Sequence, residues 1–403
     1  MAERKKVRLG DIVITNKNTY SPKENWEYVN YLDTGNLTMN KIDSIQYIDL
    51  SKEKLPSRAK RKVKYNSIVY STVRPNQLHY GIIKDQPENF LVSTGFVVVD
   101  VDCNVANPDY VYYILTQREI TEHLQAIGEQ SVSAYPSIKP SDIEDLEIDL
   151  PTLEEQEKIV SILSAIDEKE RNNSAINNNL LDQLDALYIE FSQREQWVMT
   201  SIEDIAEKVA MGPFGSNIKV STFVPSGVPI ISGNHLRGYF LEEPSYNFIT
   251  EEHANRLKNS LVHSKDIVFT HAGNIGQVAM IPNSSEYSTY VLSQRQFYLR
   301  CDTSKVCPEY VNLFFHSKEG RHELLSYANQ TGVPSIAQPA TNLKKIKFPL
   351  PPIEAQRDWI TLVEPIIDLY QLNYQEIKRL STLRDSLLPK LMSGELDVSN
   401  IEL

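Results

Sequence analysis

The chain has 403 residues, 41% of them hydrophobic and 23% charged, and its 41 basic and 53 acidic side chains give a net charge of -12. This composition argues against a disordered chain. The lack of any run of about 18 apolar residues argues against a membrane span, and the lack of an apolar stretch after the basic start, residues 1–6, argues against a signal peptide. The length favours two or three domains, and we expect a soluble protein of the cytoplasm. The cysteines are only three in a long chain, an odd number, and none has a Cys or His partner at zinc-ligand spacing, so neither a disulfide framework nor a structural metal is expected; they are Cys103, Cys301 and Cys307.

Charge is spread unevenly along the chain. Between residues 142 and 170, 11 acidic residues stand against 2 basic ones, which accounts for most of the negative excess. The stretch before it contains a dense run of positive side chains, typical either of a solvated face or of a phosphate-binding surface. The members of this run are Lys52, Lys54, Arg58, Lys60, Arg61, Lys62 and Lys64.

An internal repeat with a period of about 200 residues runs through the chain. Four pairs of similar segments keep their order in both halves, at offsets of 200, 200, 199 and 198 residues. The repeat predicts two globular blocks, each followed by a helix. The paired segments are Pro108–Val111 with Pro308–Val311, Leu150–Gln156 with Leu350–Gln356, Ser67–Ser71 with Asp266–Thr270, and Pro136–Ile138 with Pro334–Ile336.

Each block is predicted to mix strands and helices in an α+β fold. The segments after Pro108 and Pro308 indicate helices, because proline is favoured in the first helical turn and apolar residues follow at helical spacing. Short β-branched and aromatic runs bounded by Gly, Pro or Asn indicate strands. These runs are Ser67–Val73, Leu91–Val101, Asp266–Thr270 and Gln296–Leu299.

A long helix is predicted after each Leu-Pro pair, since apolar residues recur in alternating steps of four and three, as in a coiled coil. The first, from residue 154 to residue 191, would be about 55 Å long. If the helices pack antiparallel, Asn173 and Asn373 come close enough for an asparagine pair to set the register. The alternative is two amphipathic helices that each pack on their own block. The predicted packing positions are Ile159, Ile166, Asn173, Leu180, Leu187, Trp359, Ile366, Asn373, Leu380 and Leu387.

Two similar blocks on antiparallel helices would be related by a pseudo-twofold axis. Proteins present two reading heads to duplex DNA in this way, about 34 Å or one helical turn apart. The repeat therefore suggests a bipartite DNA site.

Motifs for catalysis are scarce in this sequence. It lacks a phosphate-binding loop, a dinucleotide fingerprint, a nucleophile elbow and a zinc-protease motif. Asn107-Pro108-Asp109-Tyr110 is similar to a DNA adenine methylase motif, but its repeat partner, residues 307–310, keeps only the proline, an acid and the tyrosine. We therefore expect a helix start and a packed aromatic ring there. His235, His253, His263 and His271 lack metal-ligand spacing.

Polar loops provide the candidates for DNA contact. Arginine can pair with guanine, and asparagine or glutamine with adenine, through two hydrogen bonds each, although any one of these loops can be only a turn. The frame repeats while the loop contents differ, as reading two different half-sites requires. The candidates are Arg58, Lys60, Arg61, Lys62, Lys64, Ser71, Arg74, Asn76, Gln77, His79, Ser216, Asn217, Lys219, Asn234, His235, Arg237, His271, Asn274 and Gln277.

Motifs in both halves carry a family resemblance that covers nearly the whole chain. They are Leu150-Pro151 with Glu154-Glu155-Gln156, Leu350-Pro351-Pro352 with Glu354 and Gln356, the closing run 387–396, and the stretches 213–216 and 265–268. With these motifs the chain resembles the specificity subunits of type I restriction–modification systems. It departs from the common pattern at Thr152, which stands in place of a second proline and leaves the local helix start in doubt.

The resemblance implies a non-catalytic subunit with two target recognition domains, residues 1–150 and 196–350. A first spacer helix is expected in residues 151–195, and a second spacer helix with a C-terminal tail in residues 351–403. It implies double-stranded DNA, two methyltransferase subunits and motor or restriction subunits as partners. S-adenosylmethionine, ATP and Mg²⁺ are expected on those partners, and no cofactor or metal on this chain. The acidic segment suits a partner-docking surface better than a DNA-facing one, because phosphates would repel it, although a solvated helix flank remains open.

The sequence leaves three alternative functions open. One is a specificity subunit of a related methylase–nuclease of another restriction class. The second is a stand-alone DNA methylase or nuclease, against which the missing cofactor motif argues. The third is a repeat-built scaffold without a nucleic-acid role.

Overall fold

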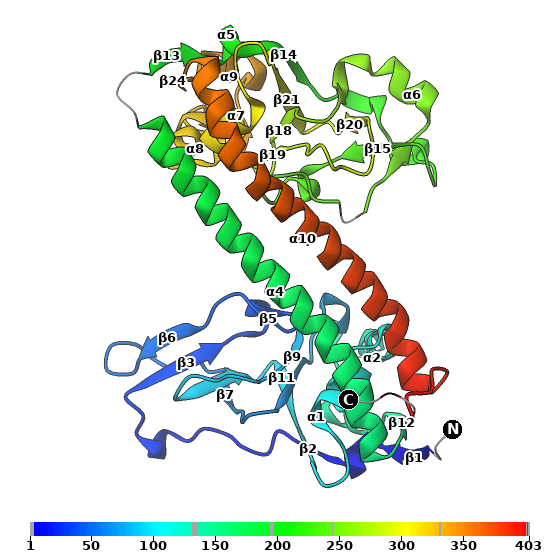
Figure 1. Cartoon of the computed structure of the whole chain (residues 1–403). Helices are drawn as coiled ribbons and strands as arrows, with labels where there is room; N and C mark the ends of the chain where they lie inside the picture. The colour runs from blue at the N-terminus through cyan, green and yellow to red at the C-terminus, as the bar shows by residue number, and fades with distance from the viewer. Residues whose placement is uncertain are drawn as a thin grey trace. The chain divides into compact units, whose positions relative to one another are not determined.

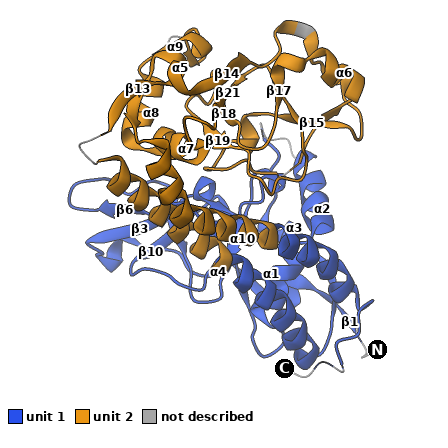
Figure 2. Ribbon diagram, turned by 45° about the horizontal axis from the view of Figure 1, so that its top comes forward, with its two compact units in different colours: residues 1–171, 378–403 blue, residues 172–377 orange. Residues whose placement is uncertain are grey.

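The computed structural model of the chain describes residues 4–130, 135–193, 197–243, 245–329, 332–399 and 401. Its contacts divide the chain into two compact units, and each takes in part of both long helices. Unit 1 is Met1–Arg171 with Lys378–Leu403, and unit 2 is Asn172–Ile377 (Figure 2). The sequence placed each long helix in a segment of its own, whereas the contacts divide both helices between the units.

Among its described residues, unit 1 contains two four-stranded sheets, with strand orders β6-β3-β10-β7 and β2-β11-β8-β9 (Figure 1). The pair β3–β10 is parallel, and the other neighbours are antiparallel. Two-stranded pairs β1-β12 and β4-β5 complete the unit. The strands are β1 (Lys5–Arg8), β2 (Val13–Thr15), β3 (Tyr28–Leu32), β4 (Leu37–Thr38), β5 (Lys41–Ile42), β6 (Gln46–Asp49), β7 (Ala59–Lys62), β8 (Ile68–Ser71), β9 (Tyr80–Ile82), β10 (Phe90–Ser93), β11 (Phe96–Val101) and β12 (Glu147–Leu150).

Unit 2 repeats this topology, with strand orders β16-β15-β20-β17 and β14-β21-β18-β19. The parallel pair recurs as β15–β20. The pairs β13-β24 and β22-β23 are also present. The strands are β13 (Val198–Ser201), β14 (Ala206–Met211), β15 (Val228–Ile231), β16 (Phe248–Ile249), β17 (Leu261–Val262), β18 (Ile267–Thr270), β19 (Val278–Met280), β20 (Tyr290–Leu292), β21 (Gln296–Cys301), β22 (Ala328–Asn329), β23 (Ser335–Ile336) and β24 (Lys347–Leu350).

The first four α-helices recur about 200 residues later in the chain as the last four. The α-helices are α1 (Pro108–Leu115), α2 (Arg118–Glu129), α3 (Pro140–Glu144), α4 (Leu153–Ser192), α5 (Ile202–Ile205), α6 (Glu251–Arg256), α7 (Pro308–His316), α8 (Lys318–Leu325), α9 (Pro339–Lys345) and α10 (Ile353–Ser393). The short 3-10 helices are η1 (Leu9–Asp11), η2 (Pro22–Glu24), η3 (Thr34–Asn36), η4 (Pro75–Gln77), η5 (Gly215–Asn217), η6 (Val220–Thr222), η7 (Gly233–His235) and η8 (Lys258–Ser260). The predicted α+β repeat with two long helices is confirmed.

The long helices α4 and α10 run antiparallel where they meet in unit 2. The Trp359 indole N–H donates to the Leu187 main-chain carbonyl at 3.3 Å. The side-chain amide of Asn177 donates to the Tyr370 main-chain carbonyl at 3.2 Å. The residue number therefore falls along α4 as it rises along α10.

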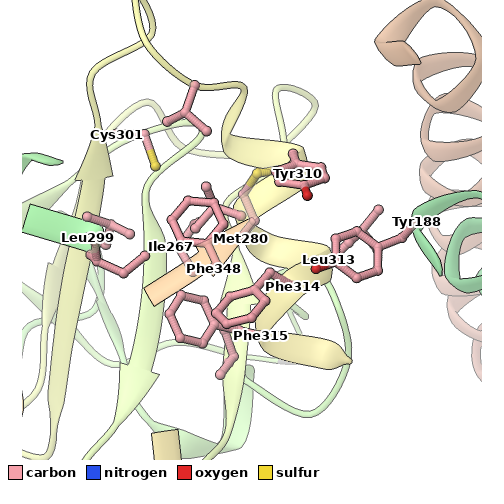
Figure 3. Close-up of a cluster of buried hydrophobic side chains, with 14 of the residues drawn as sticks. Tyr188, Ile267, Met280, Leu299, Cys301, Tyr310, Leu313, Phe314, Phe315 and Phe348 are labelled. Carbon is pink, nitrogen blue, oxygen red and sulfur yellow. The ribbon is translucent and has the colours of Figure 1, made fainter. Parts of the chain in front are cut away.

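The long helices also build the cores. In unit 1, Ile159 and Leu163 of α4 and Leu391 of α10 are buried with the β2-β11-β8-β9 sheet and α1. In unit 2, Tyr188 of α4 points toward Leu313 and Tyr310 of α7 (Figure 3), and the two tyrosine rings lie 5.3 Å apart. Each unit thus uses segments of both helices as one side of its hydrophobic core, whereas the alternative of two amphipathic helices had each helix pack on its own block alone.

The packing positions on α4 and α10 are buried to different degrees. Leu187, Ile366, Asn373, Leu380 and Leu387 are half-buried. The buried ones are Ile159, Ile166, Asn173, Leu180 and Trp359.

The asparagine contact between the helices differs from the expected one. The side-chain amide of Asn373 donates to the Asn177 side chain at 3.0 Å, one turn along α4 from Asn173. The crossing of the helices, which the heptad pattern alone does not set, selects this partner.

One predicted strand is in fact two. The run 91–101 breaks at Thr94 and Gly95, so that β10 and β11 belong to different sheets. All residues of both strands are buried, and their continuous hydrophobic pattern therefore hides the turn between them.

Candidate nucleic-acid interface

The basic run of unit 1 lies on the edge strand β7 and the loops beside it. Lys62 forms an ion pair with Glu24, and its ammonium lies 5.0 Å from the centre of the Trp26 ring. Arg61 is partly buried, and this burial lowers the pKa of its guanidinium. These two side chains are held within the unit, which reduces what they can offer a ligand.

Two further lysines of the run lie near carboxylates. Lys52 is 2.7 Å from Asp49, and Lys64 is 3.9 Å from Asp100. Both remain largely exposed. The members of the run that are exposed and form no ion pair with a described residue are Lys54, Arg58 and Lys60.

A turn at Thr94 and Gly95 connects the basic run with the polar loop after β8. The Thr94 amide donates to the Arg58 carbonyl at 2.8 Å. The amide and the hydroxyl of Thr72 donate to the Gly95 carbonyl at 2.8 and 2.9 Å. The fold thus brings together two candidate segments that are well separated in the sequence.

Four candidate side chains of this polar loop reach the surface. Asn76 and Gln77 are exposed on η4. The guanidinium carbon of Arg74 lies 4.7 Å from the centre of the Tyr135 ring, a cation–π contact. His79 is half-buried, with Nδ1 2.6 Å from a main-chain carbonyl. Arg74, Asn76 and Gln77 are therefore the better placed members of this group.

Two predicted contacts are corrected by burial. Ser71 is 2% exposed, and its hydroxyl donates to the Val73 carbonyl at 3.0 Å. His235 is 4% exposed, accepts a hydrogen bond from the Ser232 amide at 2.9 Å and stacks on Tyr246 with ring centres 4.5 Å apart. Both side chains hold the local fold and do not reach the surface.

In unit 2, the candidate loops meet at the turn between β20 and β21. The side-chain amide of Gln294 donates to the carbonyls of Gly215 and Ile218. The His271 amide donates to the Arg295 carbonyl at 2.9 Å, and its ring Nε2 lies 3.1 Å from the Gln294 carbonyl. This turn therefore contacts the segments that follow both β14 and β18.

A third loop joins this group. A Cβ added to Gly233 would lie 3.0 Å from Oε1 of Gln277, so η7 packs against the loop that follows β18. Gln277 and His271 are half-buried, and the side chain of Ser216 lies outside what the structure describes. The exposed candidates in these loops are Asn217, Lys219, Asn234, Arg237 and Asn274.

Three main-chain hydrogen bonds hold the loop after β8 in unit 1. The amide of Thr72 donates to Gly95, and the carbonyl of Thr72 accepts from Ile138, both at 2.8 Å. The amide of Arg74 donates to the Pro136 carbonyl at 2.9 Å. The loop is thereby fixed between the β10–β11 turn and the segment before α3.

The same three hydrogen bonds hold the loop after β18 in unit 2. The His271 amide donates to Arg295 at 2.9 Å, and the His271 carbonyl accepts from Ile336 at 2.8 Å. The Gly273 amide donates to the Pro334 carbonyl at 3.0 Å. We call these equivalent sets of three bonds the shared frame.

The sequence reading missed the turns that complete the frame. Gln294 and Arg295 are exposed between the buried strands β20 and β21, and Thr94 and Gly95 lie at the same place in unit 1. The repeat could have revealed these turns, because aligning Ser93 with Ser293 at the offset of 200 residues aligns Thr94 and Gly95 with Gln294 and Arg295.

The Asn107-Pro108-Asp109-Tyr110 string begins a helix, as predicted. The Asn107 side chain accepts hydrogen bonds from the amides of Asp109 and Tyr110 at 2.9 and 3.4 Å, which caps α1. The buried Tyr110 ring packs in the core of unit 1. All groups of this string thus have a structural role.

Three further observations concern the described residues alone. They contain no helix long and apolar enough to cross a bilayer. No group of three or more His, Cys, Asp or Glu side chains that could hold a metal occurs in those ranges. The three cysteines are free thiols, and burial raises the pKa of Cys307 to about 11.

Comparison with known proteins identifies the family. Residues 1–182 and 194–382 match the family described as "Type I restriction modification DNA specificity domain". The HindI specificity subunit of Haemophilus influenzae is 30% identical over 191 residues, 47% of this chain and 40% of that protein. The MjaIX specificity subunit of Methanocaldococcus jannaschii is 23% identical over 414 residues, 94% of this chain and 87% of that protein.

A solved structure shows the same fold. The type I restriction–modification S subunit from M. genitalium is 16% identical, with a TM-score of 0.56 over 97% of this chain and 96% of that one. The expectation of a specificity subunit, the non-catalytic class, agrees with these relatives. The chain therefore belongs to the family of type I restriction–modification DNA specificity subunits.

Proposed function

We propose that the chain reads a bipartite sequence in double-stranded DNA, with unit 1 contacting one half and unit 2 the other. It directs adenine methylation by two methyltransferase subunits and restriction by motor or restriction subunits. S-adenosylmethionine, ATP and Mg²⁺ are bound by those partners, and this chain supplies the recognition of sequence.

The shared frame is the observation that carries the proposal. Equivalent main-chain hydrogen bonds present different side chains: Thr72 and Arg74 in unit 1 stand where unit 2 has His271 and Gly273. Sequence is read by side chains at base edges, whereas contacts to the backbone only position a protein. A constant frame with variable side chains therefore suits two readers of different half-sites.

Charge on unit 1 supports contact with DNA. Lys54, Arg58 and Lys60 are exposed and form no ion pair with a described residue, and the Arg58 carbonyl is bonded to the frame turn at Thr94. Phosphates attract such free cations, and each neutralised phosphate releases counterions and makes binding weaker in salt.

The acidic segment of unit 1 is assigned to partner docking. Several of its carboxylates are satisfied internally, as in the pairs Asp145 with Arg8 and Glu155 with Arg4. Other carboxylates face outward without an ion pair to a described residue, and they repel DNA. These are Glu147, Asp149, Glu157 and Glu168.

The test is selection from a pool of short random-sequence duplexes by the full chain, isolated from its own cells with the subunits that co-purify. The proposal predicts enrichment of two short specific elements separated by a spacer of fixed length and free sequence. Enrichment of no motif, or of one undivided motif, would contradict it. Methyl transfer or cleavage by the chain freed of other subunits would instead support a stand-alone enzyme.

A further inference from the structure

Each unit places one arginine in the shared frame, but takes it from a different chain segment. In unit 1 the loop after β8 supplies Arg74, and the facing turn has Gly95. In unit 2 the arrangement is reversed, because the loop has Gly273 and the turn supplies Arg295. The two halves therefore keep an arginine in the frame without keeping its position in the sequence.

The loop position and the turn position lie next to each other. Nη1 of Arg295 lies 3.3 Å from the place that a Cβ on Gly273 would take, so a side chain there would force Arg295 to move. In unit 1, a Cβ on Gly95 would lie 2.8 Å from the methyl carbon of Thr34, so a side chain in the turn would force Thr34 to move. Each unit thus has its single arginine beside a glycine of the facing segment.

The backbone at the loop position favours glycine. Gly273 has φ of +86°, and Arg74 has φ of +50°, both in the left-handed region. Bulky residues rarely adopt this conformation, and strained backbone of this kind is concentrated at functional sites. Unit 1 therefore keeps an arginine where glycine would fit with less strain, which points to a role for the side chain itself.

Both guanidinium groups are available to a ligand. Neither forms an ion pair with a carboxylate of a described residue, and Arg295 is exposed. Arg74 is oriented by the Tyr135 ring, 4.7 Å away. A guanidinium with no internal carboxylate offers its planar pair of N–H donors to two neighbouring acceptors on a partner.

We propose that Arg74 and Arg295 are equivalent DNA-binding residues, each donating two hydrogen bonds to a pair of adjacent acceptors in its own half of the target. The inference rests on the proposed function and assigns specific residues to it. The acceptors are O6 and N7 of a guanine, or two oxygens of a phosphate, and the two sources give different results on substitution.

The test uses the random duplex pool with Arg74→Ala and Arg295→Ala in the full chain. Base reading predicts that each variant loses about 10- to 100-fold of discrimination at one base pair, in opposite halves of the motif. Phosphate binding predicts a uniform loss of affinity, a salt slope smaller by about 0.9 and an unchanged motif. An unchanged motif with unchanged affinity for both variants would overturn the inference.

A lysine substitution separates the two sources of acceptors. Arg295→Lys keeps the charge but not the planar pair of donors, so it should retain phosphate binding and lose discrimination for guanine. The salt slope of this variant should remain that of the parent chain under either source.

A swap tests the equivalence of the two positions. The double variant Gly273→Arg, Arg295→Gly gives unit 2 the arrangement of unit 1. It should recover at least half of the affinity or discrimination that Arg295→Gly alone removes. If the swap recovers nothing while its abundance and thermal unfolding match those of the parent, the two positions are not equivalent.

Controls keep this inference separate from the proposed function. Arg118→Ala removes an exposed arginine of α2 that pairs with Glu122, and it should leave the motif unchanged. If the parent chain enriches no bipartite motif, the proposed function fails. If the parent enriches one and neither Arg74→Ala nor Arg295→Ala alters binding, only the inference about these arginines fails.

Discussion

The long helices meet through charged side chains in unit 1 and through apolar side chains at the equivalent positions of unit 2. In unit 1, Arg384 of α10 lies 3.2 Å from Asp167 and 3.1 Å from Glu170 of α4. The Tyr113 hydroxyl donates to Asp167 at 2.6 Å. Burial disfavours the charged guanidinium, but Glu170 and Asp167 outweigh it and raise the pKa of Arg384.

In unit 2 the residues 200 positions away belong to a single hydrophobic cluster. Leu184 takes the place of Arg384 and is completely buried. The other equivalents are Leu313, Ile367 and Tyr370. Equivalent positions of the repeat are therefore charged or polar in unit 1 and lie in the hydrophobic core of unit 2.

The difference between the two contacts affects which segments of α4 and α10 pack against each other. A helix segment packed in the wrong unit would bury Arg384 away from Asp167 and Glu170, with only the largely exposed Asp385 beside it, and a buried charge that loses its partners costs about 3–5 kcal/mol. An apolar contact is compatible with many partners, whereas a charged contact is compatible with few. Because the two contacts differ, they favour the observed pairing of helix segments within each unit.

Breaking the apolar contact should have the largest effect. Leu184→Arg places a charge without a carboxylate in the core of unit 2, and we expect a loss of about 4 kcal/mol or more in its free energy of unfolding. Urea denaturation followed by the fluorescence of Trp197 and Trp359, both in unit 2, measures it. The control Leu184→Met keeps the volume and should cost under about 1.5 kcal/mol. Equal stability of the two variants would contradict the comparison.

Breaking the charged contact should have the next largest effect. Arg384→Leu removes the partly buried cation that Asp167 and Glu170 share, and unit 1 should lose about 3 kcal/mol. Urea denaturation monitored through Trp26 measures this loss. An Arg384→Leu chain as stable as the parent would show that the ion pairs contribute nothing.

Replacing the whole charged contact tests whether the two contacts are equivalent. The fourfold variant Tyr113→Leu, Asp167→Ile, Glu170→Tyr, Arg384→Leu gives unit 1 the residues of unit 2. Because no buried charge is left unpaired, its stability should return to within about 1 kcal/mol of the parent. A fourfold variant as unstable as Arg384→Leu alone would contradict the equivalence of the two contacts.

Acid should weaken unit 2 through a residue that unit 1 lacks. Burial lowers the pKa of His316 to about 4, whereas Thr116 stands at the equivalent place in unit 1. Below about pH 6.5 the unfolded chain takes up a proton that the folded chain excludes, so stability falls as the pH drops toward the folded pKa. Between about pH 7 and pH 5 the loss should be about 2 kcal/mol. His316→Gln should remove this part of the pH dependence, and an unchanged pH profile would contradict the assignment.

The smallest effect is expected from the exposed cations beside and on β7, the edge strand of unit 1. Arg58→Ala with Lys60→Ala should lower affinity about tenfold and reduce the salt slope by about 1.8, because up to two phosphate contacts are lost. Titration of duplex DNA at several salt concentrations measures both. Lys62→Ala is the matched control with a smaller expected effect, since Lys62 is already paired with Glu24. Equal effects of the control and the double variant would count against selective use of the free cations.

Much of the fold follows from the sequence. The ordered repeat and the heptad pattern predict two α+β halves and two long helices, because both depend on local periodicity and spacing. The loop after β8, with Arg74 and Asn76, was found because it follows a buried strand and is rich in polar groups.

Contacts across the repeat could not be predicted from the sequence. Arg384 interrupts an apolar column visibly, but its partners Asp167 and Glu170 lie more than 200 residues away, and no local pattern connects them. Arg295 stands in a short polar turn without Gly or Pro, and only its packing beside Gly273 gives it a place in the frame. Ser71 and His235 were misassigned because polarity in a sequence does not reveal burial.

The most direct test of bipartite recognition is a genome-wide map of adenine methylation in the source cell with and without this gene. Deletion of the gene should abolish methylation at a motif of two short elements around a fixed spacer, and the intact gene should restore it. Methylation that is unchanged by deletion, or a lost motif made of one undivided element, would contradict recognition by two units.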